Sequence, residues 1–557
     1  MPQSTTDGGR ITLVPLGGLG EIGRNMFAVE CNDDIVVIDA GLMFPEQEML
    51  GIDLVIPDIS WLMERVTRVR GIVLTHGHED HIGGLPYILP RLPVPVFGTA
   101  LTLGLLRNKL REHRLLDSTD LREVHAGETV AMGRLSVEFV HTTHSIPDAC
   151  ALALHTPLGT IVHSGDFKLD HTPIHGEPPD LARLARLGDE GVLLLMSDST
   201  NVESEGITPS ERSVGPSLAR IFAESPGRVL MATFASNISR LQQAFDAASA
   251  DDRRILVVGR SMMNNVQVAQ ELGFLRAGSG ALIWPRQMEG LEDRQLLVVC
   301  TGSQGEPLSA LARIAAGEHH LVELKAGDTV VLSANPIPGN EELVHRTVNN
   351  LYRQGARVFA SSRHGVHASG HASREELKML LTLTRPHYFV PVHGEYRHLA
   401  IHAELARAVG IPSEHVVPID NGTVVEVDAT GIRRTGRRVP AGYVYVDGLS
   451  IEEAGDVVLR DRRHLAQDGV VIVVLTVERS TGAVVGRPDL ISRGFSEDSA
   501  METLFEEARE HVLRLVEPLT PDAGWTVWQT TIHEGLARFL YQRTQRRPMI
   551  LPVVTEV

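Results

Sequence analysis

The first 200 residues alternate between short apolar runs rich in β-branched residues and polar turns. Seven of these runs have strand length and end in a polar loop: ITLVPL, MFAVE, DIVVIDAG, GIVLTH, LSVEFVHTTH, GTIVHSGDF and GVLLLMSDST. Short apolar runs bounded by turn residues are typical of strands. Several of the loop ends carry His or Asp, and layered α/β scaffolds commonly present their active-site residues on such loops.

From about residue 209 the pattern changes to buried strands that alternate with helical segments, which predicts a parallel α/β unit. Beyond residue 375 the order is helix, strand (HYFVPVHGE) and helix, and DGVVIVVLTV opens a last segment with a helix near 500–517. We therefore predict a strand-rich first part (1–208), an α/β unit (209–361), a return to the first domain (362–447), a linker (448–464) and a C-terminal domain (465–557).

Length and composition narrow the class of protein. A chain of 557 residues favours two to four domains, and 43% hydrophobic with 22% charged residues is typical of globular proteins. A formal charge of −18 argues against a protein that coats or slides along nucleic acid, and 4% aromatic residues argue against a broad base-stacking platform. An enzyme that holds phosphate through metal ions and local arginines remains compatible with this charge.

The chain predicts a cytoplasmic protein with no membrane partner. Its N-terminus, MPQSTTDGGR, is too polar for a signal peptide, and no apolar run approaches the ~20 residues that a membrane span needs. The three cysteines, Cys31, Cys150 and Cys300, are far apart and form no CxxC pattern, so we expect them to be reduced and buried.

Three glycines near the start imitate a dinucleotide-binding fingerprint. Gly18, Gly20 and Gly23 spell GxGxxG after a strand, and Asp39 follows at the end of another strand. The fingerprint requires a helix directly after the glycines, so that its N-terminus meets the pyrophosphate. Here NMFAVE has the pattern of a strand, and we expect the glycines to form a tight turn beneath an active site.

The strongest local signal is LTHGHEDHIGG, which places His76, His78, Asp80 and His81 directly after a strand. His and Asp are good ligands for Zn²⁺ or Mn²⁺. The spacing of His76 and His78 lets both point into one pocket from an extended turn, while Asp80 and His81 begin the next helix and can face a second ion. Solvated loop histidines are the alternative, and four ligands within six residues argue against it.

Two catalytic metal sites need more ligands than this cluster holds, and later strand ends supply them. His144 ends FVHTTHS, Asp166 ends IVHSGDF and His393 ends FVPVHGE. A single His at a strand end is more often structural, but together the three complete the set.

The order HxHxDH, then His, then Asp resembles the metallo-β-lactamase superfamily, whose fold is an αββα sandwich. The resemblance implies that Asp166 bridges two divalent ions, Zn²⁺ in the first instance and Mn²⁺ as the alternative. It also implies that Asp39 supports the metal loop from behind. The implied ligands are His76, His78 and His144 for the first ion and Asp80, His81 and His393 for the second.

Later segments resemble the β-CASP nucleases of this superfamily, in which an α/β domain is inserted into the lactamase fold. The segments are SDSTN with Asp198, TGSQGE, PIPGNE, HASGH with His371, and PVHGE. Their order, with a C-terminal appendage, is similar to the bacterial ribonuclease J family. The expected fold is thus a metallo-β-lactamase αββα sandwich with an inserted β-CASP α/β domain and a small α+β C-terminal domain.

This resemblance implies a metal-dependent ribonuclease that hydrolyses RNA phosphodiester bonds in RNA maturation, including rRNA processing, and in mRNA decay. The implied activities are a 5′→3′ exonuclease that prefers 5′-monophosphate ends and an endonuclease. Two cations about 3.5–4 Å apart can clamp a phosphodiester and activate a water. Asp80 and Asp166 would also orient that water, and His371, held by Asp198, would be the general acid; phosphate binding alone is the alternative role for His371.

Two loops are implied substrate contacts. The residues His367, Ala368, Ser369, Gly370 and His371 would hold a nucleotide phosphate, and the start of the helix SREELKMLL adds backbone N–H groups. The second loop has Phe234, Ala235 and Ser236, where Phe234 either stacks on a base or belongs to the core.

Charged residues outside the ligand set are weaker candidates. Five basic residues flank the expected site, although each could be ordinary surface charge: Arg240, Arg260, Arg363, Arg374 and Lys378. Asp53 and Asp447 are candidates for an extra structural cation, and solvated turn residues are the alternative.

Other functions stay open at this point. A hydrolase of a small ester or thioester would use the same first 200 residues but leaves 209–361 and HASGH unexplained. A non-catalytic RNA-binding subunit would be expected to lack metal ligands. A DNA nuclease of the same group would differ from a ribonuclease only in its lack of contacts to the RNA 2′-OH. The expected partners are single-stranded, 5′-monophosphorylated RNA, further copies of the chain in a homodimer or homotetramer joined through the C-terminal domain, and an RNA-degradation complex.

Overall fold

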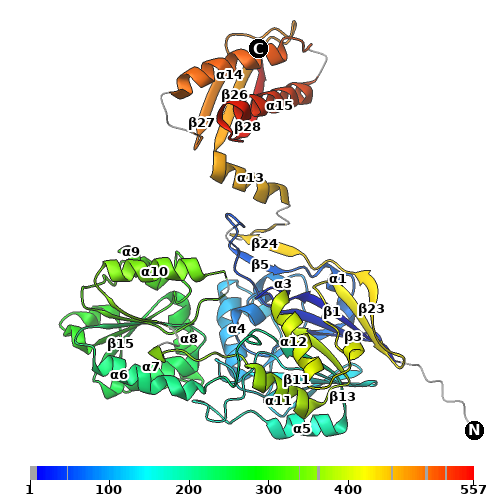
Figure 1. Ribbon diagram of the computed structural model, residues 1–557, viewed down its shortest axis with the longest axis vertical. Coiled ribbons are helices and arrows are strands. Elements are labelled where there is room, and N and C mark those ends of the chain that lie inside the picture. The colour runs from blue at the N-terminus through cyan, green and yellow to red at the C-terminus, as the bar shows by residue number, and fades with distance from the viewer. Residues whose placement is uncertain are drawn as a thin grey trace, which may run out of the picture. The chain divides into compact units, whose positions relative to one another are not determined.

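The computed structural model describes residues 9–46, 48–337, 339–360, 364–448, 450–452, 456–495, 500–520 and 524–557. The chain forms two compact units, one made of Met1–Phe44 with Leu54–Val444 and the other of Pro45–Asp53 with Tyr445–Val557. Many elements of the two units are labelled in Figure 1. Among the described helices, none combines the length and apolar character needed to cross a bilayer.

Two large sheets form the centre of the first unit. The first has eight strands, in the order β23 (Gly431–Arg438), β22 (Thr423–Asp428), β1 (Ile11–Gly17), β3 (Met26–Cys31), β4 (Asp34–Ile38), β6 (Val69–Val73), β7 (Val96–Gly98) and β8 (Leu121–Glu123). The second has six strands, in the order β20 (Tyr388–Val392), β13 (Val192–Asp198), β12 (Gly159–His163), β11 (Cys150–Thr156), β10 (Leu135–His141) and β9 (Thr129–Met132).

The sheets pack face to face because each strand turns alternate apolar residues inward. Leu13 and Val36 of the eight-stranded sheet share one buried cluster with Phe139 and Leu194 of the six-stranded sheet. Helices cover the outer face of each sheet. The central strands are therefore buried on both faces, which explains why their sequences are nearly continuous hydrophobic runs. The covering helices include α4 (Ala100–Glu112) on the first sheet and α5 (Leu181–Glu190), α11 (Arg374–Thr384) and α12 (Tyr396–Ala408) on the second. The predicted αββα sandwich is confirmed.

A third sheet lies between the two halves of this sandwich in the sequence. Its strands run in the order β16 (Leu282–Ile283), β15 (Arg254–Val258), β17 (Leu296–Cys300), β14 (Val229–Ala232), β18 (Thr329–Leu332) and β19 (Arg357–Ala360), and all the pairs are parallel. Figure 1 shows helices on both faces: α9 (Ala310–Ala316) and α10 (Glu341–Arg353) on one, and α6 (Gly215–Ala223), α7 (Ile238–Ala250) and α8 (Arg260–Glu271) on the other. The predicted inserted α/β domain is therefore present.

The glycine-rich segment near the start is a turn between strands. Gly18, Gly20 and Gly23 all have positive φ (86°, 76° and 118°), which favours glycine, and strand β3 follows at Met26. In this segment, which the structure describes throughout, no helix begins where the dinucleotide fingerprint requires one. The prediction of a turn is correct.

The second unit contains a small α+β domain. Its sheet has the order β27 (Asp489–Arg493), β26 (Val470–Val477) and β28 (Met549–Glu556), and alternate residues of β26 pack under helices α14 (Ala500–Val516) and α15 (Trp525–Thr544). The segment 448–464, predicted as a linker, contains β25 (Ser450–Glu452) and most of α13 (Asp456–Asp468). The sequence of α13, DVVLRDRRHLAQD, is strongly polar, and this polarity suggests a linker rather than a helix.

A buried ion pair at the amino ends of β14 and β18 gives a stability prediction. Nε and Nη2 of Arg228 lie 3.1 and 2.5 Å from the carboxylate of Asp328, and both side chains are at most 6% exposed. Asp328→Ala should lower the free energy of unfolding by about 3–5 kcal/mol in a urea titration, because it leaves a buried guanidinium without its counter-charge. Glu224→Ala, which breaks an ion pair with Arg220 that is 54% exposed on both sides, is the control and should cost below about 1 kcal/mol. Equal losses in the two variants would show that burial adds nothing to the importance of the Arg228–Asp328 pair.

Candidate metal centre and active site

The predicted metal ligands all follow the ends of strands in the two central sheets. The loop from His76 to His81 follows β6 and ends in the short helix α2 (Glu79–Ile82), as the sequence predicts. His144 follows β10, Asp166 follows β12 and His393 follows β20. Because the two sheets face each other, these loops meet at one edge of the sandwich.

The seven predicted ligands form two groups of donor atoms that share Asp166, and Asp198 and His371 form a third group with Asp166 and His393. One group is His76, His78, His144 and Asp166, and the other is Asp80, His81, Asp166 and His393. Within each group the donor atoms lie within 4.8 Å of one another. The structure thus brings together all seven residues that the sequence nominates, and Asp166 belongs to both groups.

Three imidazole nitrogens converge in the first group. Nδ1 of His78 lies 3.0 Å from Nε2 of His76 and 3.1 Å from Nε2 of His144. Burial lowers the pKa of all three rings, that of His78 to about 4, so they are neutral at pH 7 and keep a lone pair. Neutral imidazoles whose lone pairs face one point are the donors that Zn²⁺ and similar ions bind.

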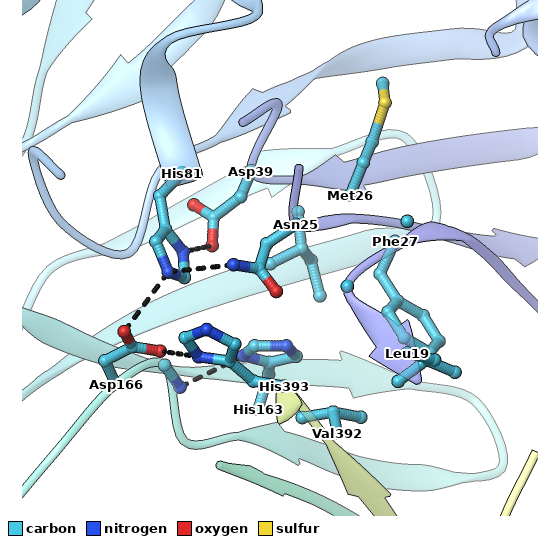
Figure 2. Close-up of a pocket in the computed structure, with 14 residues that line it drawn as sticks. Leu19, Asn25, Met26, Phe27, Asp39, His81, His163, Asp166, Val392 and His393 are labelled. Carbon is cyan, nitrogen blue, oxygen red and sulfur yellow. Dashed lines mark hydrogen bonds and ion pairs between the residues drawn. The ribbon is translucent and has the colours of Figure 1, made fainter. Parts of the chain in front are cut away.

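The second group holds more negative charge. Oδ2 of Asp166 lies 3.2 Å from Nε2 of His81, and Oδ1 lies 2.6 Å from Nδ1 of His393 (Figure 2). Burial lowers the pKa of His393, but the charges of Asp166 and Asp80 outweigh this and raise it to about 10. Nε2 of His393 is buried, lies 3.4 Å from Asp80, and makes no hydrogen bond within the described residues. A cation at this point would replace the proton and satisfy that nitrogen, so the residues fit a divalent ion.

Asp39 supports this group from behind. Its carboxylate accepts hydrogen bonds from the backbone N–H and the hydroxyl of Thr75 and lies 2.8 Å from Nδ1 of His81 (Figure 2). The contact directs Nε2 of His81 toward Asp166. Asp39 and His393 also have positive φ (58° and 53°), a conformation that costs a non-glycine residue free energy and is concentrated at functional sites.

His371 and Asp198 form a pair beside the shared carboxylate. Nδ1 of His371 lies 2.8 Å from Oδ2 of Asp198 and 4.0 Å from Oδ2 of Asp166. Burial lowers the pKa of His371, but the charge of Asp198 outweighs burial and raises it above the usual value. The ring keeps 22% of its surface exposed, so a protonated imidazole here is accessible to a ligand.

The predicted phosphate-binding loop contacts the first metal group directly. Nδ1 of His144 donates to the carbonyl of Gly370 at 2.7 Å, which fixes the ring and the loop together. The amide N–H of His371 donates to the Ser369 hydroxyl at 3.1 Å. Burial lowers the pKa of His367 to about 3, and Nδ1 of this ring is buried with no hydrogen bond within the described residues.

Arg240 has a different position from the predicted one. It is fully buried and makes a two-point ion pair with Glu211 at 2.6 and 2.9 Å. Its guanidinium also donates to the carbonyls of Val366 and Ala368 at 3.1 and 3.3 Å. Arg240 is therefore not ordinary surface charge: its buried guanidinium holds the backbone of the loop that contains His367–His371.

The start of helix α11 is also unavailable to an anion. Ser373 caps the helix, and its N–H donates to the carboxylate of Glu376 at 2.9 Å in a capping box. The N–H groups of Arg374 and Glu375 donate to the carbonyls of Ser204 and Gly206, both at 3.0 Å. These first amides are therefore satisfied, and the predicted contribution of this helix start is wrong.

The other flanking basic residues are ordinary in their contacts. Lys378 pairs with Glu375, and Arg374 donates to the Val202 carbonyl. Arg260 is exposed at the start of α8, and Arg363 lies outside the described residues.

The second predicted substrate loop lies at the carboxyl end of β14. Phe234, Ala235 and Ser236 are half-buried there, ahead of α7. Their contact with substrate stays a prediction.

Asp53 and Asp447 already have partners in the second unit. Asp53 accepts a hydrogen bond from the N–H of Gly448 at 2.8 Å, and Asp447 lies 2.5 Å from the guanidinium of Arg462. Arg462 supplies positive charge at this point, and the structural cation stays a prediction.

Three residues at the site carry no signal in the sequence. Nδ2 of Asn25 lies 3.2 Å from Nε2 of His81, and the Ser145 hydroxyl lies 3.3 Å from Nε2 of His78. His163 lines a cavity of about 10 Å³ beside Asp166 and accepts a hydrogen bond from the N–H of Gly165 (Figure 2). Of the three, only Ser145 directly follows a nominated ligand, His144, and nothing in the sequence marks Asn25 or His163 before folding.

Comparison with protein families agrees with this arrangement. Residues 19–260 match the metallo-β-lactamase superfamily, 226–351 the ribonuclease J β-CASP domain, 356–418 the Zn-dependent metallo-hydrolase RNA specificity domain and 457–557 the ribonuclease J C-terminal domain. A crystal structure of a protein of unknown function from Enterococcus faecalis V583 shares the fold, with a TM-score of 0.53 over 75% of this chain and all of that chain, at 16% identity. Fold and site together define a β-CASP metallo-hydrolase of the metallo-β-lactamase superfamily.

The full-length relatives are more specific. The chain is 43% identical to ribonuclease J2 of Bacillus subtilis over 100% of both chains. It is 43% identical to ribonuclease J of Thermus thermophilus, over 100% of this chain and 97% of that one, and 42% identical to ribonuclease J of Mycobacterium tuberculosis, over 100% and 99%. The chain belongs to the ribonuclease J family.

The backbone of the metal loop depends on a close approach at Gly41. A Cβ at this position would lie 1.7 Å from the carbonyl oxygen of Asp80 and 2.8 Å from the nitrogen of His81. Gly41→Ala should therefore displace the loop and weaken metal binding by roughly 10–100-fold, measured as metal retained during titration with a chelator. Gly278→Ala, whose Cβ would meet nothing closer than 3.9 Å, is the control. Unchanged retention in Gly41→Ala would mean that the loop can hold its ligands in place without this close approach.

Proposed function

We propose that this protein is a metal-dependent ribonuclease that hydrolyses phosphodiester bonds of single-stranded RNA with two divalent ions, Zn²⁺ in the first instance and Mn²⁺ as the alternative. The observation that carries the proposal is the Asp166 carboxylate shared by two histidine-rich donor groups in a chain of the ribonuclease J family. A shared carboxylate suits a site in which two ions act on one phosphate.

The donor groups would divide the metals between them. His76, His78 and His144 would hold one ion and Asp80, His81 and His393 the other, with Asp166 between them; this set includes no thiolate, which suits Zn²⁺ or Mn²⁺. When bound, such ions supply Lewis-acid activation of the phosphate and of the attacking water. The chain's own contribution is to place the carboxylates of Asp80 and Asp166 where they can orient that water.

His371 is proposed as the general acid. Asp198 raises the pKa of this imidazole, which favours its protonated form, and holds Nδ1, so the Nε2–H would supply the proton to the leaving 3′-oxygen. The same positive charge would hold a phosphate oxygen, so binding and proton donation are compatible roles for this residue.

The loop from His367 to His371 is proposed to hold a 5′-terminal monophosphate. Gly370 is bonded to His144, so a phosphate on this loop lies next to the metal donors. A terminal monophosphate fixed there would define the distance to the scissile bond and favour stepwise 5′→3′ digestion. Entry of an internal segment would give endonucleolytic cleavage. Phe234, Ala235 and Ser236 would contact the bases.

The cellular role follows from the activity. We propose a cytoplasmic enzyme of RNA maturation, including rRNA processing, and of mRNA decay. Self-association as a dimer or tetramer through 465–557 and membership of an RNA-degradation complex belong to the same proposal.

RNA ends give the first test. The protein is offered RNA with 5′-monophosphate, 5′-hydroxyl or 5′-triphosphate ends, in Zn²⁺ or Mn²⁺, beside DNA of the same sequence and a small thioester. Release of mononucleotides mainly from 5′-monophosphate RNA is expected. Equal cleavage of DNA would favour the DNA nuclease, and hydrolysis of the thioester without RNA cleavage would favour the small-ester hydrolase.

Removing one donor gives the second test. His76→Ala should lower the bound metal by about one ion per chain and reduce kcat by roughly a thousandfold, because several kcal/mol of transition-state stabilisation is lost. Metal content is measured by mass spectrometry and folding by circular dichroism. His125→Ala, 74% exposed and remote from the donors, is the matched control. Full activity in His76→Ala would exclude this metal site.

The proposed acid gives a pH prediction. A general acid acts only when protonated, so the rate falls as the pH rises through its pKa. Asp198 raises the pKa of His371, and Asp198→Asn should therefore move the alkaline limb of the kcat/KM profile to lower pH. The rate at neutral pH should fall by about 10²–10⁴-fold. An alkaline limb that does not move would show that His371 is not the acid.

A further inference from the structure

Strand β23 concentrates positive charge in a chain whose formal charge is −18. Its eight residues, GIRRTGRR, include four arginines, all of them exposed. The strand is at the end of the eight-stranded sheet and, in the described part of the chain, pairs with β22 alone. One side of its backbone therefore has no strand partner among the described residues.

Acidic neighbours neutralise only part of this charge. Arg433 and Arg437 lie 2.8 and 2.6 Å from Glu426, and Arg10 lies 3.4 Å from the same carboxylate. Asp428 pairs with Arg433 at 2.6 Å.

The two remaining arginines, as far as the described residues extend, have no carboxylate among their hydrogen-bond partners. Arg434 donates to the carbonyl of Pro418, and Arg438 donates to that of Asn421 at 2.8 Å. Each guanidinium keeps further N–H donors for a ligand.

An open groove of about 450 Å³ begins at the Arg438 end of the strand. Tyr443 lines it and is 37% exposed, and the guanidinium carbon of Arg24 lies 4.6 Å from the centre of its ring. Glu21 also lines the groove and pairs with Arg24 at 2.8 Å, and Asp420 adds one further carboxylate. Groove and strand together keep an excess of positive charge and offer one aromatic face.

The groove and the metal centre lie on two sides of one turn. Leu19 lines both the groove and the cavity at the metal centre. Arg24 faces the groove, while its neighbour Asn25 lines the cavity with Asp166 and approaches the Asp80 carboxylate to 3.3 Å. A polymer bound in the groove would therefore be separated from the metal centre by a single turn of chain.

We propose that this groove and strand β23 bind the part of the RNA chain that lies beyond the nucleotides at the metal centre. Arg434 and Arg438 hold backbone phosphates, and a base stacks on Tyr443. Positive side chains beside an aromatic ring are the combination that binds single-stranded nucleic acid without sequence preference. The identity of the polyanion as RNA rests on the proposed function.

Charge complementarity favours a polyanion over a protein strand here. Charged side chains on an exposed edge strand oppose the addition of another strand. Binding of an acidic protein, or of a second copy of this chain, is the alternative that the experiment must distinguish from binding of RNA.

The test uses the full-length, metal-loaded protein with Arg434→Gln and Arg438→Gln combined. These two arginines are chosen because both donate to backbone carbonyls rather than to carboxylates. Arg254→Gln with Arg357→Gln is the matched control, because both are exposed, both donate to backbone carbonyls, and both lie at the amino ends of their strands in the inserted sheet. Net charge changes equally in the two double variants.

Binding of a single-stranded RNA of roughly 30 nucleotides is followed by fluorescence anisotropy from low to high salt. Losing two phosphate contacts should reduce the slope of log Kobs against log salt by about 1.4, since each contact on a single strand contributes about 0.7. The control should keep the slope of the unmodified protein. For cleavage, the ratio of KM for this RNA to KM for an RNA of about four nucleotides should rise roughly tenfold in the groove variant.

Tyr443→Leu tests the stacking contact separately. It should weaken binding of the long RNA by about tenfold and leave the salt slope unaltered, because stacking releases no counterions. Tyr443→Phe keeps the ring and should restore binding.

Two results would overturn the proposal. One is a salt slope that the groove and control variants share, and the other is an altered oligomeric state in sedimentation with no change in RNA binding, which would assign the strand to a protein partner. Absence of RNA cleavage by the unmodified protein would instead overturn the proposed function, and the anisotropy slopes would still decide whether the groove binds RNA.

Discussion

The structure depends on one buried carboxylate, that of Asp166, in contact with histidines from four separate positions of the chain. A buried negative charge is costly unless positive charge or hydrogen bonds balance it. Here His76, His81, His144 and His393 surround it; His81 lies in the short helix α2, and the other three lie in loops that follow strands. Only the stacking of the two sheets brings residues so far apart in the sequence within bonding distance of one another.

A second buried charge network joins the inserted α/β domain to the sandwich. Glu211 and Arg240 pair in the interior, and Arg240 holds the loop that precedes α11. Glu376 accepts hydrogen bonds from the N–H groups of Leu169 and Thr208 at 2.8 and 2.7 Å, which connects both ends of the insertion to the strand end that carries Asp166. These contacts give the loop from His367 to His371 a rigid base, because a buried ion pair with full hydrogen bonding has one low-energy geometry.

Much of the fold was predictable because local pattern and tertiary environment agree. Strands such as β4, β6 and β12 are short, apolar and bounded by turns. The His and Asp residues that follow these strands are the types that bind metal ions, which made the site recognisable. What failed depends on contacts that no local pattern encodes. An arginine at this position could bind phosphate or lie on the surface, but Arg240 is buried in an ion pair with Glu211. In the same way the start of α11 looked like an anion site, but Glu376 and two preceding carbonyls occupy its amides. Asn25, His163 and Gly41 gain their importance only when the segments before β3, at the end of β12 and after β4 come together around the metal loop.

The hydrogen bond between His144 and the Gly370 carbonyl has a thermodynamic consequence. The His144 ring belongs to the first donor group and also holds the loop. Binding of an ion and binding of a ligand on the loop are therefore coupled, and linkage requires this coupling to be reciprocal. A ligand bound on the loop would slow the escape of an ion held by His144, and a bound ion would in turn strengthen binding at the loop. Scarcity of divalent ions would thus act on substrate capture and chemistry together, giving a steeper response to ion concentration than either effect alone.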